Sequence, residues 1–174
     1  MIFILNIKPV ISTSEIRDFL LSRLKLKSCD INELLGENDE ALINYEIKIR
    51  DYHVEFRTEL LFFLSDQTCL ELKIYNSLQI ALLFCTYFNI EVVIDDGSND
   101  PYRWILVERN EMIYVVDEKI GADDDFSINY KSKKEIPVEE VMKVLPGKDY
   151  FLLAPGERPT FVNTDPTWNK RFYS

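Results

Sequence analysis

Two short triplets of residues, Glu46-Ile47-Lys48 and Glu71-Leu72-Lys73, have the residue types and spacing of a metal-dependent hydrolytic site. Each triplet places a carboxylate and an ammonium two residues apart, and residues two apart in a strand point to the same side of a sheet. Carboxylates can hold a divalent cation, and a lysine beside them can steady the attacking water. The triplets are therefore candidates for catalysis if both lie in strands.

This Glu-x-Lys arrangement resembles the one in restriction-type nucleases. The competing interpretation is that alternation in any half-exposed strand produces such triplets freely. Proteins that engage DNA phosphates usually carry a basic surface, whereas this chain has 30 acidic and 20 basic residues and a net charge of −10. We therefore keep the metal-dependent nuclease as an alternative and expect no metal site.

The other residues that could do chemistry are sparse. The single histidine, His53, is expected on the polar face of a strand, and one histidine cannot supply both a base and its orienting partner. Five scattered glycines give no phosphate-binding loop. The cysteines Cys29, Cys69 and Cys85 form no Cys-x-x-Cys pair, which argues against zinc or disulfides and favours a reducing compartment. We expect no catalytic residue and no cofactor.

Acidic residues are concentrated in the middle of the chain. Residues 76–130 contain eleven acidic side chains and three basic ones, which gives this segment a charge of −8 out of a total of −10. A patch of one sign attracts the opposite sign and raises encounter rates, so the concentration says more about a partner than about the fold.

Much of this charge lies in two short runs, Asp95-Asp96-Gly97-Ser98-Asn99-Asp100 and Asp123-Asp124-Asp125. Oxygen ligands of this kind could bind calcium, but neither run has the EF-hand spacing. Asp, Asn and Gly are also ordinary turn residues, so solvated turns are a second interpretation. The third is that the loops dock a basic surface. On that hypothesis the contact residues are Asp95, Asp96, Asp100, Tyr102, Asp123, Asp124 and Asp125.

The segment Tyr102-Arg103-Trp104 follows the first acidic run and contains the residue types that dominate interface energetics. Alternation along a strand puts Arg103 on the face opposite Tyr102 and Trp104. We expect Trp104 to pack in the core, as strand aromatics commonly do, and Tyr102 to be a possible anchor for a partner.

The spacing of apolar residues predicts an α+β domain. Ser12-Thr13-Ser14-Glu15 has the spacing of a helix capping box, and Asn76 can cap a second helix that is apolar almost all round. The longest apolar run, residues 80–88, is too short to span a bilayer. We predict helices after residues 12, 76 and 136, one helical turn near 31–35, and strands at 2–7, 45–56, 60–64, 70–74, 92–94, 102–107, 112–116 and 150–153. The strand at 45–56 should contain a bulge or tight turn at Arg50-Asp51, and the last hairpin should turn at Arg109-Asn110-Glu111.

These elements fit a single domain over residues 1–154, with a mixed, mostly antiparallel sheet, a central buried helix and one or two flanking helices. Residues 155–174 contain prolines and four large aromatics, so we expect a tail packed on the domain, with a partner or self-association contact as the alternative. The first seven residues have no positive charge before their apolar stretch and predict a strand, not a signal peptide. We expect a cytoplasmic protein.

Residues 76–117, with the buried helix, the stretch Val-Val-Ile-Asp-Asp-Gly-Ser-Asn-Asp-Pro-Tyr-Arg-Trp-Ile-Leu-Val and the hairpin after it, are similar to the small acidic immunity proteins encoded beside bacterial toxins. These include the immunity proteins of contact-dependent growth inhibition. The resemblance is one of size, charge and α+β layout, and it transfers no residue role. It implies a cytosolic protein that binds one toxin domain, often a basic nuclease, and blocks its active site or its substrate-binding surface. The alternatives are the metal-dependent nuclease and a DNA mimic; we expect no direct contact with nucleic acid or membrane.

Overall fold

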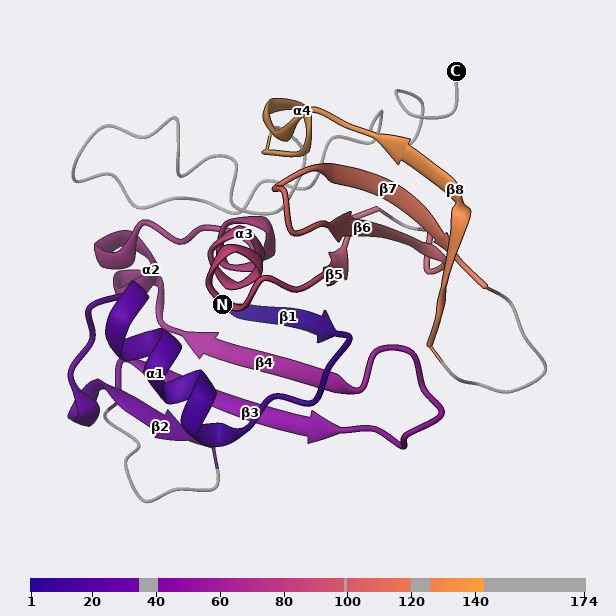
Figure 1. Ribbon diagram of the computed structural model, residues 1–174. Helices are drawn as coiled ribbons and strands as arrows, with labels where there is room; N and C mark the ends of the chain where they lie inside the picture. The colour runs from indigo at the N-terminus through magenta and orange to yellow at the C-terminus, as the bar shows by residue number, and fades with distance from the viewer. Residues whose placement is uncertain (35–40, 99, 120–125, 143–174) are drawn as a thin grey trace.

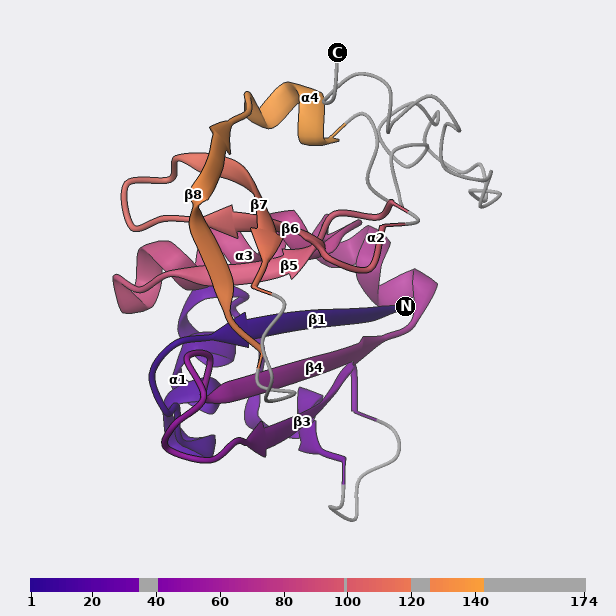
Figure 2. The same ribbon diagram turned by 90° about the vertical axis from the view of Figure 1, so that its right-hand side faces the viewer.

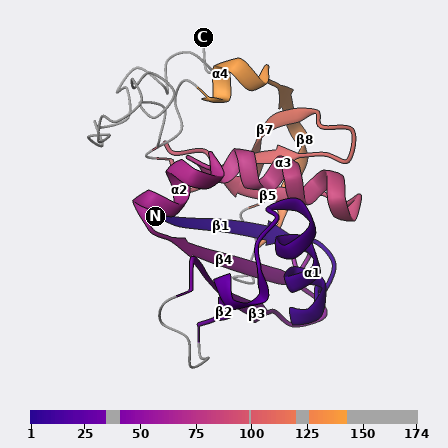
Figure 3. The same cartoon turned by 90° about the vertical axis from the view of Figure 1, so that its left-hand side faces the viewer.

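The computed structural model describes residues 1–34, 41–98, 100–119 and 126–142, and within them one eight-stranded sheet carries helices on one face (Figures 1 and 3). The strands are β1 (Ile2–Ile7), β2 (Ile31–Glu33), β3 (Ile43–Ile49), β4 (Thr58–Leu64), β5 (Val92–Asp95), β6 (Arg103–Val107), β7 (Ile113–Glu118) and β8 (Ile128–Glu135). The helices are α1 (Thr13–Arg23), α2 (Asp66–Leu72), α3 (Ser77–Phe88) and α4 (Val138–Met142), with a 3₁₀ turn at Ser28–Asp30.

The strand order is β2-β3-β4-β1-β5-β6-β7-β8. β2 pairs with β3 in parallel, and the other six neighbouring pairs are antiparallel. The prediction of an α+β domain with a mixed, mostly antiparallel sheet is confirmed.

The first strand of the chain, β1, lies in the middle of the sheet between β4 and β5. Phe3, Leu5 and Ile7 are at most 4% exposed and belong to the core beneath the helices. Successive side chains in a strand point to opposite faces, so the residues between them face the other side of the sheet. There Ile2 and Ile4 remain 59% and 41% exposed.

The helices α1 and α3 begin where the sequence predicts. The Ser12 hydroxyl accepts from the Glu15 amide and the Glu15 carboxylate accepts from the Ser12 amide, which completes the capping box of α1. Asn76 caps α3 through the Gln79 amide. α3 packs on β1 and β5, buries Phe84 against Phe19, and leaves Leu83 38% exposed.

A second, smaller core lies on the face of the sheet opposite the helices. Its centre is formed by Phe56 and by strand residues from β5 to β8. The loop 50–57 supplies Phe56, and β8 runs steeply across the view in Figure 2 up to α4. The fully buried members are Phe56, Val93, Leu106, Val116 and Ile128, and the half-buried aromatics packed on them are Trp104, Tyr114, Phe126 and Tyr130.

Three predicted elements are wrong. The strand expected at 45–56 is interrupted at Arg50-Asp51 as predicted, but it does not resume: β3 ends at Ile49 and residues 50–57 form the β3–β4 loop, so His53 is a loop residue. The strand expected at 70–74 is instead α2, because Ser65 caps the Thr68 amide and starts a helix there. Where one helical turn was expected near 31–35, residues 31–33 form the strand β2, which pairs with β3.

One strand, β8, was not predicted at all. It pairs with β7 through a register shift between Val115 and Asp117. The predicted strand at 150–153 and the tail at 155–174 lie outside the described residues. No helix in the described part of the chain is long and apolar enough to cross a membrane.

We expect Phe84→Ala to lower the free energy of unfolding by about 3–5 kcal/mol, because it empties a fully buried site in the helix-side core. Urea denaturation followed by circular dichroism measures the loss. Leu83→Ala is the matched control on the same helix, since Leu83 is 38% exposed, and should lower the free energy by less than about 1 kcal/mol. Equal losses in the two variants would contradict this packing.

Candidate binding surface

The loop between β5 and β6 is held by its own side chains. Among its described residues, three aspartates and one serine each accept a hydrogen bond from an amide two residues further on, which is how Asp and Ser stabilise turns. Gly97 has a φ of 71°, a conformation that glycine adopts without strain. The bonds run from Gly97 N to Asp95 Oδ1 (2.6 Å), Ser98 N to Asp96 Oδ1 (2.8 Å), Asp100 N to Ser98 Oγ (3.1 Å) and Tyr102 N to Asp100 Oδ1 (3.0 Å).

A buried ion pair fastens this loop to the sheet. The Arg103 guanidinium donates from Nε to Asp96 Oδ2, and the two side chains are each 1% exposed. Arg103 lies opposite Tyr102 and Trp104 in the alternation, as predicted, and on the side of Ile105 in the helix-side core. The prediction that Asp96 is a surface contact is therefore wrong: its carboxylate is inside the protein because it neutralises Arg103.

The other predicted contact residues of this loop reach the surface. Asp95 is exposed, Asp100 is half-buried and Tyr102 is 52% exposed. Desolvation raises the pKa of Asp95 above its ordinary value, the neighbouring Asp96 adds to the rise, and the hydrogen bond from Gly97 opposes it. Asp123, Asp124 and Asp125 lie outside the described residues.

Strand pairing places Asp95 next to apolar side chains on the face of the sheet opposite the helices. Asp95 pairs with Trp104 on β6. Asn6 pairs with Val93 in the antiparallel β1–β5 ladder, so Ile4 and Asp95, each two residues from that pair, point to the same face of the sheet. We call the group Ile2, Ile4, Asp95, Tyr102 and Trp104 the outer patch. It combines three apolar or aromatic side chains that are between 41% and 59% exposed with a surface carboxylate.

Three other acidic residues of the segment 76–130 lie at the opposite end of the same strands. Glu91 precedes β5, and Glu108 and Glu111 belong to the β6–β7 turn. Glu91 is paired with Lys8 at 3.2 Å and Glu108 with Lys133. The acidic segment is thus divided between two ends of the sheet, and at this second end basic partners offset the charge.

Lys8 is the centre of a polar cluster at that second end. Its ammonium donates to Tyr130 Oη at 2.7 Å and to Glu91 at 3.2 Å, and lies 3.3 Å from Glu55. Desolvation lowers the pKa of Lys8, but the hydrogen bonds to Tyr130 and Glu91 outweigh it, so the pKa is raised overall. Burial raises the pKa of Tyr130 as well. The cluster therefore holds a charged lysine and a neutral tyrosine at neutral pH.

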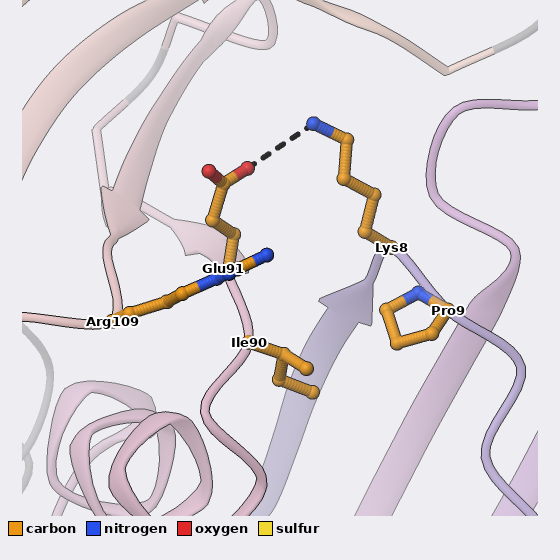
Figure 4. A pocket seen from close by; sticks show the side chains of 5 residues that line it. All are labelled: Lys8, Pro9, Ile90, Glu91 and Arg109. Atoms are coloured by element: carbon orange, nitrogen blue, oxygen red, sulfur yellow. Dashed lines mark hydrogen bonds and ion pairs between the residues drawn. The ribbon is translucent and has the colours of Figure 1, made fainter.

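A cavity of about 380 Å³ opens beside this cluster (Figure 4). Lys8 and Pro9 line it from the end of β1, Ile90 and Glu91 from the α3–β5 connection, and Arg109 from the β6–β7 turn. In Figure 4 the Arg109 side chain reaches toward Glu91, with Lys8 and Pro9 across the cavity. Sequence reasoning missed this site because its members are far apart along the chain: Lys8 is 83 residues from Glu91 and 122 from Tyr130.

Only one of the two Glu-x-Lys triplets lies in a strand: Glu46 and Lys48 lie on one side of β3, 3.9 Å apart, whereas the second triplet lies at the end of α2. Lys48 also pairs with Glu59 at 3.4 Å. Glu71 lies in α2 and accepts from Gln67 at 2.8 Å, while Lys73 is the left-handed C-cap of that helix. Within residues 1–34, 41–98, 100–119 and 126–142, no three His, Cys, Asp or Glu residues are grouped so that they could hold a metal ion.

We expect Asp96→Asn to lower the free energy of unfolding by about 3–5 kcal/mol, because it removes the charge opposite a buried guanidinium. Asp95→Asn is the matched control one residue earlier; since Asp95 is exposed, it should change stability by less than about 0.5 kcal/mol. Chemical denaturation of both variants measures the difference. If Asp96→Asn is as stable as Asp95→Asn, the pair does not fasten the loop.

The cysteines give a second test of the fold around the site. Burial raises the pKa of Cys85 to about 12 and that of Cys69 to about 11, whereas Cys29 is exposed. Because the thiolate is the reactive form, we expect a disulfide reagent to titrate Cys29 alone in the native protein and all three thiols in concentrated guanidinium chloride. Rapid reaction of Cys69 or Cys85 in the native state would show that the core opens.

No family model, no curated protein and no solved structure matches this chain.

Proposed function

We propose that this protein is a non-catalytic binding protein of the cytoplasm, an immunity protein that binds and neutralises one cognate basic toxin domain. The outer patch and the Asp95–Tyr102 loop form its binding surface. Asp95 and Asp100 are the charge contacts, and Tyr102 with the neighbouring isoleucines is the apolar centre.

The observation that carries this proposal is the construction of the loop. Four side-chain to backbone hydrogen bonds and the buried Asp96–Arg103 pair tie down residues 95–98 and 100–103 in the absence of any partner. A surface that is already ordered loses little conformational entropy on binding, so more of the contact energy becomes affinity. Loops that serve only as solvated turns do not need a buried ion pair beneath them.

The composition of the outer patch supports a protein partner. Interface centres are enriched in aromatic residues and depleted of charge, while charged residues form the rim. Here Tyr102, Ile2 and Ile4 are exposed, and strand alternation places them on the same face of the sheet as Asp95. A basic partner would be guided by the rim carboxylates and retained by the apolar centre, because charge mainly sets association rates and desolvated aromatics mainly slow dissociation.

The double variant Asp95→Asn/Asp100→Asn tests the charge contacts, because asparagine keeps the oxygen that accepts each loop hydrogen bond. On the immunity hypothesis the partner is a toxin domain encoded beside this gene, so the assay uses the C-terminal domain of any secreted protein found there, and stopped-flow fluorescence measures the rates. We expect the association rate constant to fall about tenfold at low ionic strength and its salt dependence to flatten.

The matched control is Asp18→Asn/Asp51→Asn, which removes the same charge from two exposed aspartates outside the proposed surface. An equal fall in the association rate in this control would assign the effect to net charge and contradict the proposed surface. A neighbouring gene that encodes no toxin domain would contradict the immunity function itself.

Tyr102→Ala tests the apolar centre in the same assay. We expect the dissociation rate constant to rise about tenfold or more with little change in association, as truncation of an interface aromatic does. Tyr52→Ala is the control, because Tyr52 is 85% exposed in the β3–β4 loop, outside the proposed surface. Unchanged dissociation in Tyr102→Ala would exclude Tyr102 as an anchor.

A further inference from the structure

The cavity at the second end of the sheet has opposite charges and apolar walls that the proposed function does not use. Its volume of about 380 Å³ lies within the range of small-molecule sites. Three segments that are distant in the sequence meet around it: the end of β1, the α3–β5 connection and the β6–β7 turn.

Of the two cations that line the cavity, one is already engaged. The three N–H groups of the Lys8 ammonium face Glu91, Tyr130 and Glu55, all within 3.3 Å. Arg109 is exposed, and among the described residues it makes no hydrogen bond or ion pair. Its guanidinium is therefore the group that can bind a guest without breaking an existing contact.

The chemistry of these walls selects a class of ligand. A guanidinium matches the geometry of a carboxylate and can bind both of its oxygens at once. Pro9 and Ile90 line the same cavity and offer apolar contact to an alkyl group attached to that carboxylate. Arg109 alone would also accept phosphate, so the selection depends on the remaining wall.

Glu91 is the residue that distinguishes a monocarboxylate from phosphate or a dicarboxylate. Its carboxylate lies in the same cavity, with 22% of the side chain exposed, and stays there because Lys8 and Tyr130 both donate to its Oε2. A second negative charge on the guest would face Glu91 and be repelled. An amino group next to the guest's carboxylate would instead be attracted. The cavity thus favours a single negative charge and tolerates or prefers an adjacent ammonium.

We propose that this cavity binds a small aliphatic monocarboxylate, free α-amino acids included, with its carboxylate on Arg109 and its alkyl group against Pro9 and Ile90. The site is separate from the outer patch, because Ile2 of the patch begins β1 whereas Lys8 and Pro9 of the cavity follow its last residue. Occupation of one surface does not cover the other.

The test is a nuclear magnetic resonance titration of the isotope-labelled full chain, following the amides of Ile90, Glu91 and Arg109. Leucine, isocaproate, succinate and inorganic phosphate are added separately. We expect saturable shifts with leucine or isocaproate, and binding at least tenfold weaker with succinate and phosphate. Arg109→Gln should weaken binding of the monocarboxylate at least tenfold and leave the remaining spectrum unchanged, since Arg109 is exposed.

Arg23→Gln is the matched control, because it removes an exposed arginine from α1, outside the cavity. It should bind as the unaltered chain does. The proposal is overturned if neither monocarboxylate gives saturable shifts, if phosphate or succinate binds as tightly, or if Arg109→Gln and Arg23→Gln bind alike.

Discussion

The arrangement of this protein depends on the pairing of β1 with both β4 and β5. This strand joins the β2-β3-β4 half of the sheet to the β5-β6-β7-β8 half, and it buries Phe3, Leu5 and Ile7 beneath the helices. Because β1 runs antiparallel to β5, its beginning lies beside Asp95 and its end beside Glu91. A single six-residue strand therefore positions one side of the outer patch and one wall of the cavity.

The buried pair of Asp96 and Arg103 explains why net charge alone describes the surface poorly. Both side chains are 1% exposed, so two formal charges of the acidic segment are inside the protein. Lys8 and Lys133 offset further carboxylates at the other end of the strands. What remains at the loop is a small number of fixed carboxylates, and a small, ordered set specifies the position of a partner better than a diffuse acidic face would.

Some elements could be predicted from short stretches of sequence that mark a helix start or a turn. The capping box at Ser12, the cap at Asn76 and the turn of the β6–β7 hairpin are each recorded within a few residues, and all three are found in the structure. The alternation of Leu70, Leu72 and Ile74 covered only three positions, too few to outweigh a serine cap that begins a short helix.

Elements fixed by distant contacts could not be predicted in this way. β8 is mostly polar, and its assignment depends on hydrogen bonds to β7. Of the predicted contact residues, Asp95, Asp100 and Tyr102 reach the surface, but nothing local marks Asp96 as the buried member of the loop. The cavity is lined by Lys8, Glu91 and Arg109 from three segments that are distant in the chain. A single sequence does not show that these segments lie together in the fold.

The polar side chains of β8 also disfavour edge-to-edge association between copies of this protein. Within the described residues β8 ends the sheet, so one side of its backbone is open to a further strand. Lys131 and Lys134 are exposed along it, and the register shift against β7 distorts the ladder. Charged side chains and irregular pairing both discourage edge-to-edge aggregation. The polar side chains that made this strand hard to predict from the sequence are therefore also the ones that disfavour pairing of β8 with a strand of another molecule.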